Sequence, residues 1–132
     1  MSTIDLFRDG EIATLTLNNP GKLNAINLAM WNQLAENMAN ISVDRNIRCV
    51  VLRGQGNEAF AAGGDLEEFL TGRSTLDQAL HYHGQVASAL RAIDDCPHPT
   101  VALIQGACIG GGLEIAGVCD FRICGESARF GA

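Results

Sequence analysis

The sequence has few prolines, few aromatic residues and no surplus of positive charge. Only 3 of its 132 residues are proline and 5% are aromatic, whereas 15 are glycine. The formal net charge of −6 at pH 7 argues against a nucleic-acid partner, because binding a phosphate backbone requires a basic surface. The many glycines predict tight turns rather than disorder. With 47% hydrophobic residues, the chain can build the core of one ordinary domain.

Membrane, leader and metal-binding patterns are also missing. The most apolar stretch, residues 101–118, is interrupted by glycines and carries Glu114, which a membrane span tolerates poorly. The N-terminus has no basic region followed by an apolar one. The five cysteines form no CxxC pair and no zinc-ligand spacing, and their odd number predicts reduced thiols in a cytoplasmic protein. We therefore expect no metal, no membrane association and a cytoplasmic location.

The order of apolar patterns predicts an α/β fold with parallel strands. Short alternating or apolar runs predict strands at 4–7, 12–17, 49–52, 100–105 and 120–124, with a hairpin turn at Asp9-Gly10. Helical spacing predicts helices after Asn27, over 75–94 and from about Leu113. Residues 54–64 are expected to form a loop. His83 is expected at the edge of the core, and His81, two residues earlier, in solvent.

Two glycine-bearing segments precede predicted helix starts. In residues 106–114, an apolar strand leads into three glycines and then Leu113-Glu114; in residues 59–66, Gly63-Gly64 leads into Asp65. The first N–H groups of a helix have no partner inside it and lie at the positive end of its dipole. Two such loops side by side would make an oxyanion hole, in which each donor is worth ~2.7–4 kcal/mol in the transition state. The alternative is that the glycines only allow close packing.

Two acidic residues in these segments are candidates for chemistry. Glu114 begins an otherwise apolar helix, where burial and the helix dipole could tune it as a general acid or base. The alternative is an ordinary glutamate of a first helical turn, facing solvent. Asp65 is either a helix cap or a catalytic group.

A third glycine pattern offers a different function. Residues 54–59 match the dinucleotide fingerprint GxGxxA, but Gly63-Gly64 interrupts the helix that should follow. A nucleotide-dependent oxidoreductase is therefore a minor hypothesis.

Three ordered motifs together resemble the crotonase superfamily, the enoyl-CoA hydratase/isomerase family. They are residues 19–25 with Asn-Pro and Lys-Leu-Asn-Ala, residues 59–66 with Gly-Gly-Asp-Leu, and residues 106–114 with Gly-Gly-Gly-Leu-Glu. The resemblance implies a crotonase-like (ClpP/crotonase) spiral of ββα units that binds acyl-CoA thioesters. It implies that residues 1–132 are the N-terminal part of a single acyl-CoA-binding domain.

The same resemblance implies roles for single residues. Gly64 and Gly111 would supply the two oxyanion N–H groups. Glu114 would be the first of two glutamates that position the water added across the 2,3-double bond of a trans-2-enoyl-CoA. Coenzyme A arrives with the substrate, so no separate cofactor is expected. The residues implied to hold it are Lys22, Leu23, Ala25, Ala62, Asp65 and Leu66.

The chain departs from the family pattern at its C-terminus. The second glutamate is expected just past Ala132, and the helices that complete the acyl pocket and a homotrimer or hexamer are missing. The function implied is an enoyl-CoA hydratase. The alternatives are an enoyl-CoA isomerase, another acyl-CoA enzyme of the family, or a catalytically inactive truncated paralogue that binds coenzyme A.

Overall fold

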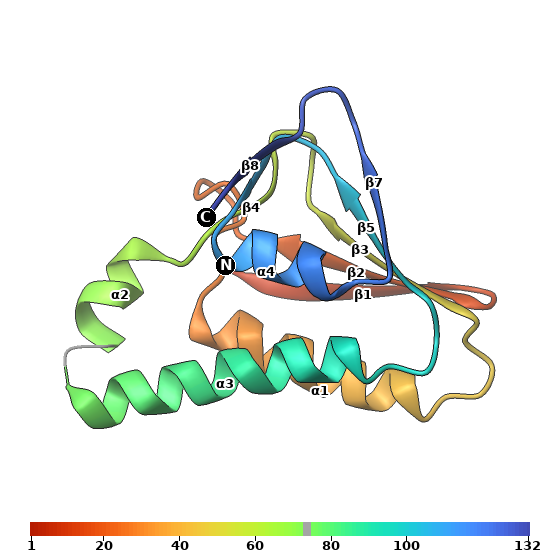
Figure 1. The fold of residues 1–132 in the computed structure, drawn as a ribbon, viewed down its shortest axis with the longest axis horizontal. Coiled ribbons are helices and arrows are strands. Elements are labelled where there is room, and N and C mark those ends of the chain that lie inside the picture. The colour runs from red at the N-terminus through yellow and green to blue at the C-terminus, as the bar shows by residue number, and fades with distance from the viewer. Residues whose placement is uncertain (73–74) are drawn as a thin grey trace.

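A computed structural model describes residues 1–72 and 75–132, apart from the side chains at positions 69, 70 and 72. The strands are β1 (Thr3–Asp9), β2 (Ile12–Asn18), β3 (Cys49–Gly54), β4 (Ala59–Ala62), β5 (Thr100–Ile104), β6 (Ala107–Ile109), β7 (Phe121–Cys124) and β8 (Arg129–Gly131). The helices are α1 (Leu28–Ser42), α2 (Leu66–Gly72), α3 (Leu76–Asp94) and α4 (Gly111–Val118). Figure 1 shows their arrangement.

The strands form two sheets that the chain visits in turn. The larger sheet has the order β1-β2-β3-β5-β7, and the smaller has the order β4-β6-β8. Apart from the β1–β2 hairpin, all pairs are parallel. Strands β3, β5 and β7 of the larger sheet lead into β4, β6 and β8 of the smaller one, and helices lead from β4 and β6 back to the larger sheet. This is the predicted spiral of ββα units.

The core lies between the larger sheet and the helices. Strands β2, β3 and β5 alternate between buried and partly buried residues, so one face of each turns inward. Helix α1 packs beside α3 (Figure 1). Asn27 caps α1 as predicted, since its Oδ1 accepts from Met30 N at 2.9 Å. No helix in the described ranges is long and apolar enough to cross a membrane.

The sequence-based prediction misses three short strands. Residues 59–62 form β4 rather than part of a loop, and β6 and β8 are not predicted at all. Each has only three or four residues, which is too short to show a period of two. Together they form the whole smaller sheet, which carries the glycine loops.

The sequence pattern also predicts one inner face for α3, and this prediction is partly wrong. The residues expected on that face are Leu76, Leu80, His83, Val86, Ala87, Leu90 and Ile93. Leu76 and Leu80 are 75% and 62% exposed, whereas Tyr82, Ala89 and Ile93 are buried. The first turns of α3 extend beyond α1 (Figure 1). His83 is exposed rather than at the edge of the core.

Candidate functional site

The glycine run places unpaired backbone N–H groups at the start of α4. Gly110 has a φ of 51°, and its N–H donates to Gly131 O at 2.9 Å. The first N–H that bonds within this helical turn belongs to Glu114 and donates to Gly110 O at 2.9 Å. The N–H groups of residues 111–113 therefore have no partner inside the helix, and that of Gly111 is the first of them.

The same glycines are also needed for close packing. A Cβ at Gly112 would lie 2.5 Å from Ala61 O, and one at Gly111 would lie 2.9 Å from Trp31 Cζ2. At Gly106, where φ is +67°, it would lie 1.9 Å from Glu58 O. The packing interpretation is therefore confirmed at these glycines, and the same close approach to β4 brings the start of α4 beside the other glycine loop.

The second donor, Gly64, lies in an isolated parallel bridge with Ile26. The Ile26 N–H donates to Gly63 O at 2.8 Å, and the Asp65 N–H donates to Ile26 O at 3.2 Å. In parallel pairing, the residue between these two bonds turns its own N–H to the opposite side. The Gly64 N–H therefore points away from Ile26.

Both predicted donors and Glu114 line one pocket with a volume of about 380 Å³. Glu114 is exposed, not buried in an apolar helix face as one interpretation of the sequence expected. The full lining is Trp31, Gly64, Asp65, Leu66, His83, Val86, Gly111 and Glu114.

A second pocket of about 290 Å³ adjoins the first, because Gly64, Asp65 and Leu66 line both. Five of the six residues implied to hold coenzyme A lie along it. Its lining is Lys22, Ala25, Ala62, Gly64, Asp65, Leu66 and Glu67. The two pockets form one groove that passes Gly64.

Leu23 is the implied residue that the structure places elsewhere. Its φ is 49°, its side chain is 46% exposed, and it lines a separate hollow beside Asn18 and Glu58. Its carbonyl accepts from Ala62 N at 3.0 Å. Leu23 therefore supports the groove through its backbone, and its side chain does not line either pocket of the groove.

Charged side chains in the lining of the 290 Å³ pocket form ion pairs with one another. Lys22 Nζ lies 3.1 Å from Asp65 Oδ2 and 3.1 Å from Glu67 Oε2. Burial alone would raise the pKa of Asp65, but hydrogen bonds and charge from Lys22, with the backbone N–H groups of Glu67 and Glu68, hold that pKa below its usual value. The hydrogen bond to Asp65 in turn raises the pKa of Lys22.

Asp65 also caps α2. Its Oδ1 accepts from Glu67 N at 3.1 Å, which is the cap interpretation of the sequence. Asp65 thus ties residues 19–25 to the start of α2, and its carboxylate is fully engaged in doing so.

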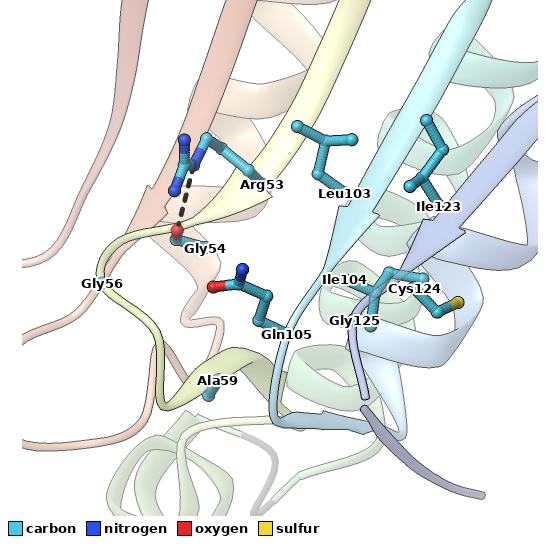
Figure 2. A pocket seen from close by; sticks show the side chains of 10 residues that line it. All are labelled: Arg53, Gly54, Gly56, Ala59, Leu103, Ile104, Gln105, Ile123, Cys124 and Gly125. Atoms are coloured by element: carbon cyan, nitrogen blue, oxygen red, sulfur yellow. Dashed lines mark hydrogen bonds between the residues drawn. The ribbon is translucent and has the colours of Figure 1, made fainter. Parts of the chain in front are cut away.

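A third hollow lies away from this groove, at the carboxyl ends of β3, β5 and β7 (Figure 2). Arg53, Gln105 and Cys124 lie around it, and it includes Gly54 and Gly56 of the dinucleotide-like pattern. Ala59, where that pattern requires a helix, begins strand β4. The oxidoreductase hypothesis is therefore wrong about the local structure.

Sequence reasoning missed His83 as a lining residue of the 380 Å³ pocket. The available signal was its spacing of three residues from Val86, which puts both on one helix face. Within the described ranges, no group of three or more His, Cys, Asp or Glu side chains could hold a metal ion.

Known proteins share this fold and these segments. The family model for enoyl-CoA hydratase/isomerase matches residues 8–132. A crystal structure of an enoyl-CoA hydratase/carnithine racemase from Magnetospirillum magneticum superposes with a TM-score of 0.95 at 50% identity, and the match covers 99% of this chain and 49% of that one.

Two curated relatives are similar to this chain and carry names of the same family. YngF of Bacillus subtilis, whose name places it among enoyl-CoA hydratases/isomerases, is 38% identical over 124 residues, which are 94% of this chain and 47% of that protein. The mitochondrial Delta(3,5)-Delta(2,4)-dienoyl-CoA isomerase of Dictyostelium discoideum is 35% identical over 128 residues, 90% of this chain and 43% of that protein. The chain spans about half the length of the relatives it matches, and it belongs to the enoyl-CoA hydratase/isomerase family.

Proposed function

We propose that this chain provides the oxyanion hole and one acid–base carboxylate of an enoyl-CoA hydratase. The observation that carries the proposal is that Gly64, Gly111 and Glu114 line a single pocket, although Gly64 lies in the loop after β4 and the other two lie in α4. The pocket continues past Gly64 toward Lys22, which leaves room for a long thioester substrate.

In the proposed reaction, the thioester oxygen accepts hydrogen bonds from the N–H groups of Gly64 and Gly111. Negative charge grows on this oxygen when a water oxygen bonds to C3 of a trans-2-enoyl-CoA. Donors that are fixed before the reaction stabilise such charge without rearranging. The Glu114 carboxylate accepts the proton that the water loses. The enolate then takes up a proton at C2, which gives the 3-hydroxyacyl thioester, and Glu114 returns its proton to solvent.

Coenzyme A would lie along the second pocket. Ala25, Ala62 and Leu66 offer its pantetheine arm an apolar wall with backbone groups nearby. Lys22, whose ammonium is paired with Asp65 and Glu67, lines the same pocket. No additional cofactor is required, because the substrate carries the coenzyme.

An isomerase is the second candidate. The dienoyl-CoA isomerase relative favours it, because moving a double bond also takes a proton off one carbon and returns a proton at another. For the whole protein we also propose a homotrimer or hexamer. The side chains of Phe121 and Ile123, 60% and 61% exposed on β7, support a face covered by protein.

Glu114→Gln tests the proposal. The change keeps size and hydrogen bonding but removes the base, so hydration of trans-2-butenoyl-CoA should fall by ~10²–10⁴-fold. Turnover is read as loss of the conjugated thioester absorbance, and binding by calorimetry should change little. Glu126→Gln is the matched control, because Glu126 is exposed and lines none of the pockets described above.

The outcomes separate the candidates. Equal turnover in Glu114→Gln would refute the role of Glu114. Conversion of a 3-enoyl-CoA in preference to hydration of the 2-enoyl-CoA would favour the isomerase. Thioester binding without turnover of either substrate would identify a binding module.

A further inference from the structure

Part of the lining of the 380 Å³ pocket has no role in the proposed chemistry. Two apolar side chains, those of Trp31 and Val86, line this pocket and not the adjoining one of 290 Å³. Trp31 lies on α1, and although it reaches the pocket, it is only 3% exposed and belongs to the hydrophobic core. Trp31 is therefore a wall of the pocket that the core holds in place.

The indole ring of Trp31 packs directly against Gly111, one of the two proposed donors. A Cβ on Gly111 would lie 2.9 Å from Trp31 Cζ2 and 3.5 Å from Trp31 Cη2, whereas ordinary contact begins near 3.4 Å. The ring thus fills the space in which a side chain at position 111 would begin. Because Trp31 and Gly111 also line the same pocket, a ligand atom bonded to the Gly111 N–H comes close to this edge of the indole.

The order of the two pockets sets the direction of a bound thioester. Residues 64–66 line both pockets, so the passage between them runs past Gly64. With coenzyme A in the 290 Å³ pocket and the thioester oxygen on the N–H groups of Gly64 and Gly111, the sulfur faces that pocket. The acyl chain is bonded to the other side of the carbonyl carbon, so it extends into the 380 Å³ pocket toward Trp31.

We propose that Trp31 limits the length of the acyl chain, so that the groove selects short-chain acyl-CoA thioesters. This inference rests on the proposed thioester function. The first carbons of the chain meet the indole, and further methylene groups have no space beyond it, because the ring is embedded in a close-packed core. Room for one methylene in an apolar pocket is worth about 10–200-fold in discrimination. Trp31 is thus a specificity-determining residue rather than a catalytic one.

The ring cannot swing aside to admit a longer chain. The Trp31 backbone N–H donates to Asn27 O at 3.0 Å in the first turn of α1, and the Asn27 side chain caps that turn. Rotation toward α4 is blocked, because there is no space for even one more carbon between the indole and Gly111. The wall is therefore fixed before any ligand binds.

A smaller side chain at position 31 should open the pocket into the space of the indole. The indole N–H donates to no residue in the described parts of the chain, so its removal leaves no buried acceptor without a donor. Leucine keeps an apolar side chain with a favourable helix propensity. Trp31→Leu therefore reduces packing and breaks no polar contact.

The affinities of two saturated thioesters measure the length limit without any turnover. Calorimetry on the whole protein should show tighter binding of butyryl-CoA than of octanoyl-CoA. In Trp31→Leu, the affinity for octanoyl-CoA divided by that for butyryl-CoA should rise by about 10–200-fold. Trp31→Phe keeps one aromatic ring but is shorter, so it should raise this ratio by a smaller factor.

Met38→Ala is the matched control for loss of packing. Met38 is fully buried on the same helix and lines neither pocket of the groove. Its truncation leaves a cavity in the core, which destabilises the fold. A merely structural role of Trp31 predicts that both affinities fall together, as in Met38→Ala, with an unchanged ratio. Only a wall of the acyl pocket predicts a gain for the longer chain.

Trp31 is also the only tryptophan in the sequence, so its fluorescence reports on the pocket. Butyryl-CoA should change the emission of the wild type more than coenzyme A does, because only the thioester brings an acyl chain to the indole. The difference between the wild type and Trp31→Phe isolates the signal of Trp31. This measurement and the affinities of Trp31→Phe decide the question if Trp31→Leu does not fold.

The results distinguish this inference from the proposed function. Failure of the wild type to bind either thioester would overturn both. Three results would overturn the inference alone: octanoyl-CoA bound as tightly as butyryl-CoA by the wild type, an unchanged affinity ratio in the Trp31 variants, or an emission that responds equally to butyryl-CoA and coenzyme A. A wild type that prefers butyryl-CoA, with the ratio raised in Trp31→Leu and unchanged in Met38→Ala, would support it.

Discussion

Replacing Gly112 with alanine should displace the helix that carries the candidate site. The new Cβ would lie 2.5 Å from Ala61 O and 2.9 Å from Ala61 Cβ, whereas ordinary contact begins near 3.4 Å. The oxygen belongs to the backbone of β4, so no side-chain rotation can relieve the clash. Helix α4 must therefore move away from β4.

Gly117→Ala provides a matched control for the magnitude. Gly117 lies in the same helix, and a Cβ there meets nothing within 4 Å. Alanine in place of glycine stabilises a helix by about 1 kcal/mol, and both variants gain this. Overpacking typically costs 1–3 kcal/mol, so Gly112→Ala should be less stable than Gly117→Ala by about that amount.

Urea unfolding followed by circular dichroism measures both variants beside the wild type. We expect the midpoint to fall for Gly112→Ala relative to Gly117→Ala, with similar slopes. Thioester binding should weaken only in Gly112→Ala, because the shift of α4 carries the Gly111 N–H with it. Equal or higher stability of Gly112→Ala would refute the close-packing argument.

Two further predictions concern titratable groups. Asp65→Asn keeps the cap but removes the charge paired with Lys22, so the variant should be less stable than the wild type at neutral pH. Folding lowers the pKa of Asp65, so this difference in the free energy of unfolding should disappear as the pH falls below about 4. Urea titrations at several pH values measure the difference. Burial raises the pKa of the Cys108 and Cys119 thiols to about 11, so a disulfide reagent at pH 8 should modify exposed Cys124 first and these two only on unfolding. Rapid modification of Cys108 in the folded chain would contradict its placement.

The sequence predicts the larger sheet better than the smaller one. Strands β2, β3 and β5 have five to seven residues each, and their inner faces show a clear pattern. Strands β4, β6 and β8 are too short for that, and they are held by pairing with one another rather than by local preference. Tertiary contacts therefore decide them, and these are invisible to a local pattern.

In the candidate site, too, some features are visible in the sequence and others depend on tertiary contacts. The glycines that precede α2 and α4 are visible in the sequence, and so is Glu114 at the start of α4. The shared pocket also includes His83, which is exposed beside the groove rather than packed in the core. Periodicity places His83 on a helix but does not tell which neighbour covers it.

The direction of each proposed donor depends on a segment distant in the sequence. Gly64 is oriented because Gly63 O and Asp65 N are both bonded to Ile26, about forty residues earlier. The start of α4 is held because the Gly110 N–H bonds to Gly131 O on β8, about twenty residues later. The backbone around both donors is therefore fixed only when Ile26, the glycine loops and β8 have all assembled. An oxyanion hole that must not rearrange during reaction requires such anchoring, and short loops alone would not supply it.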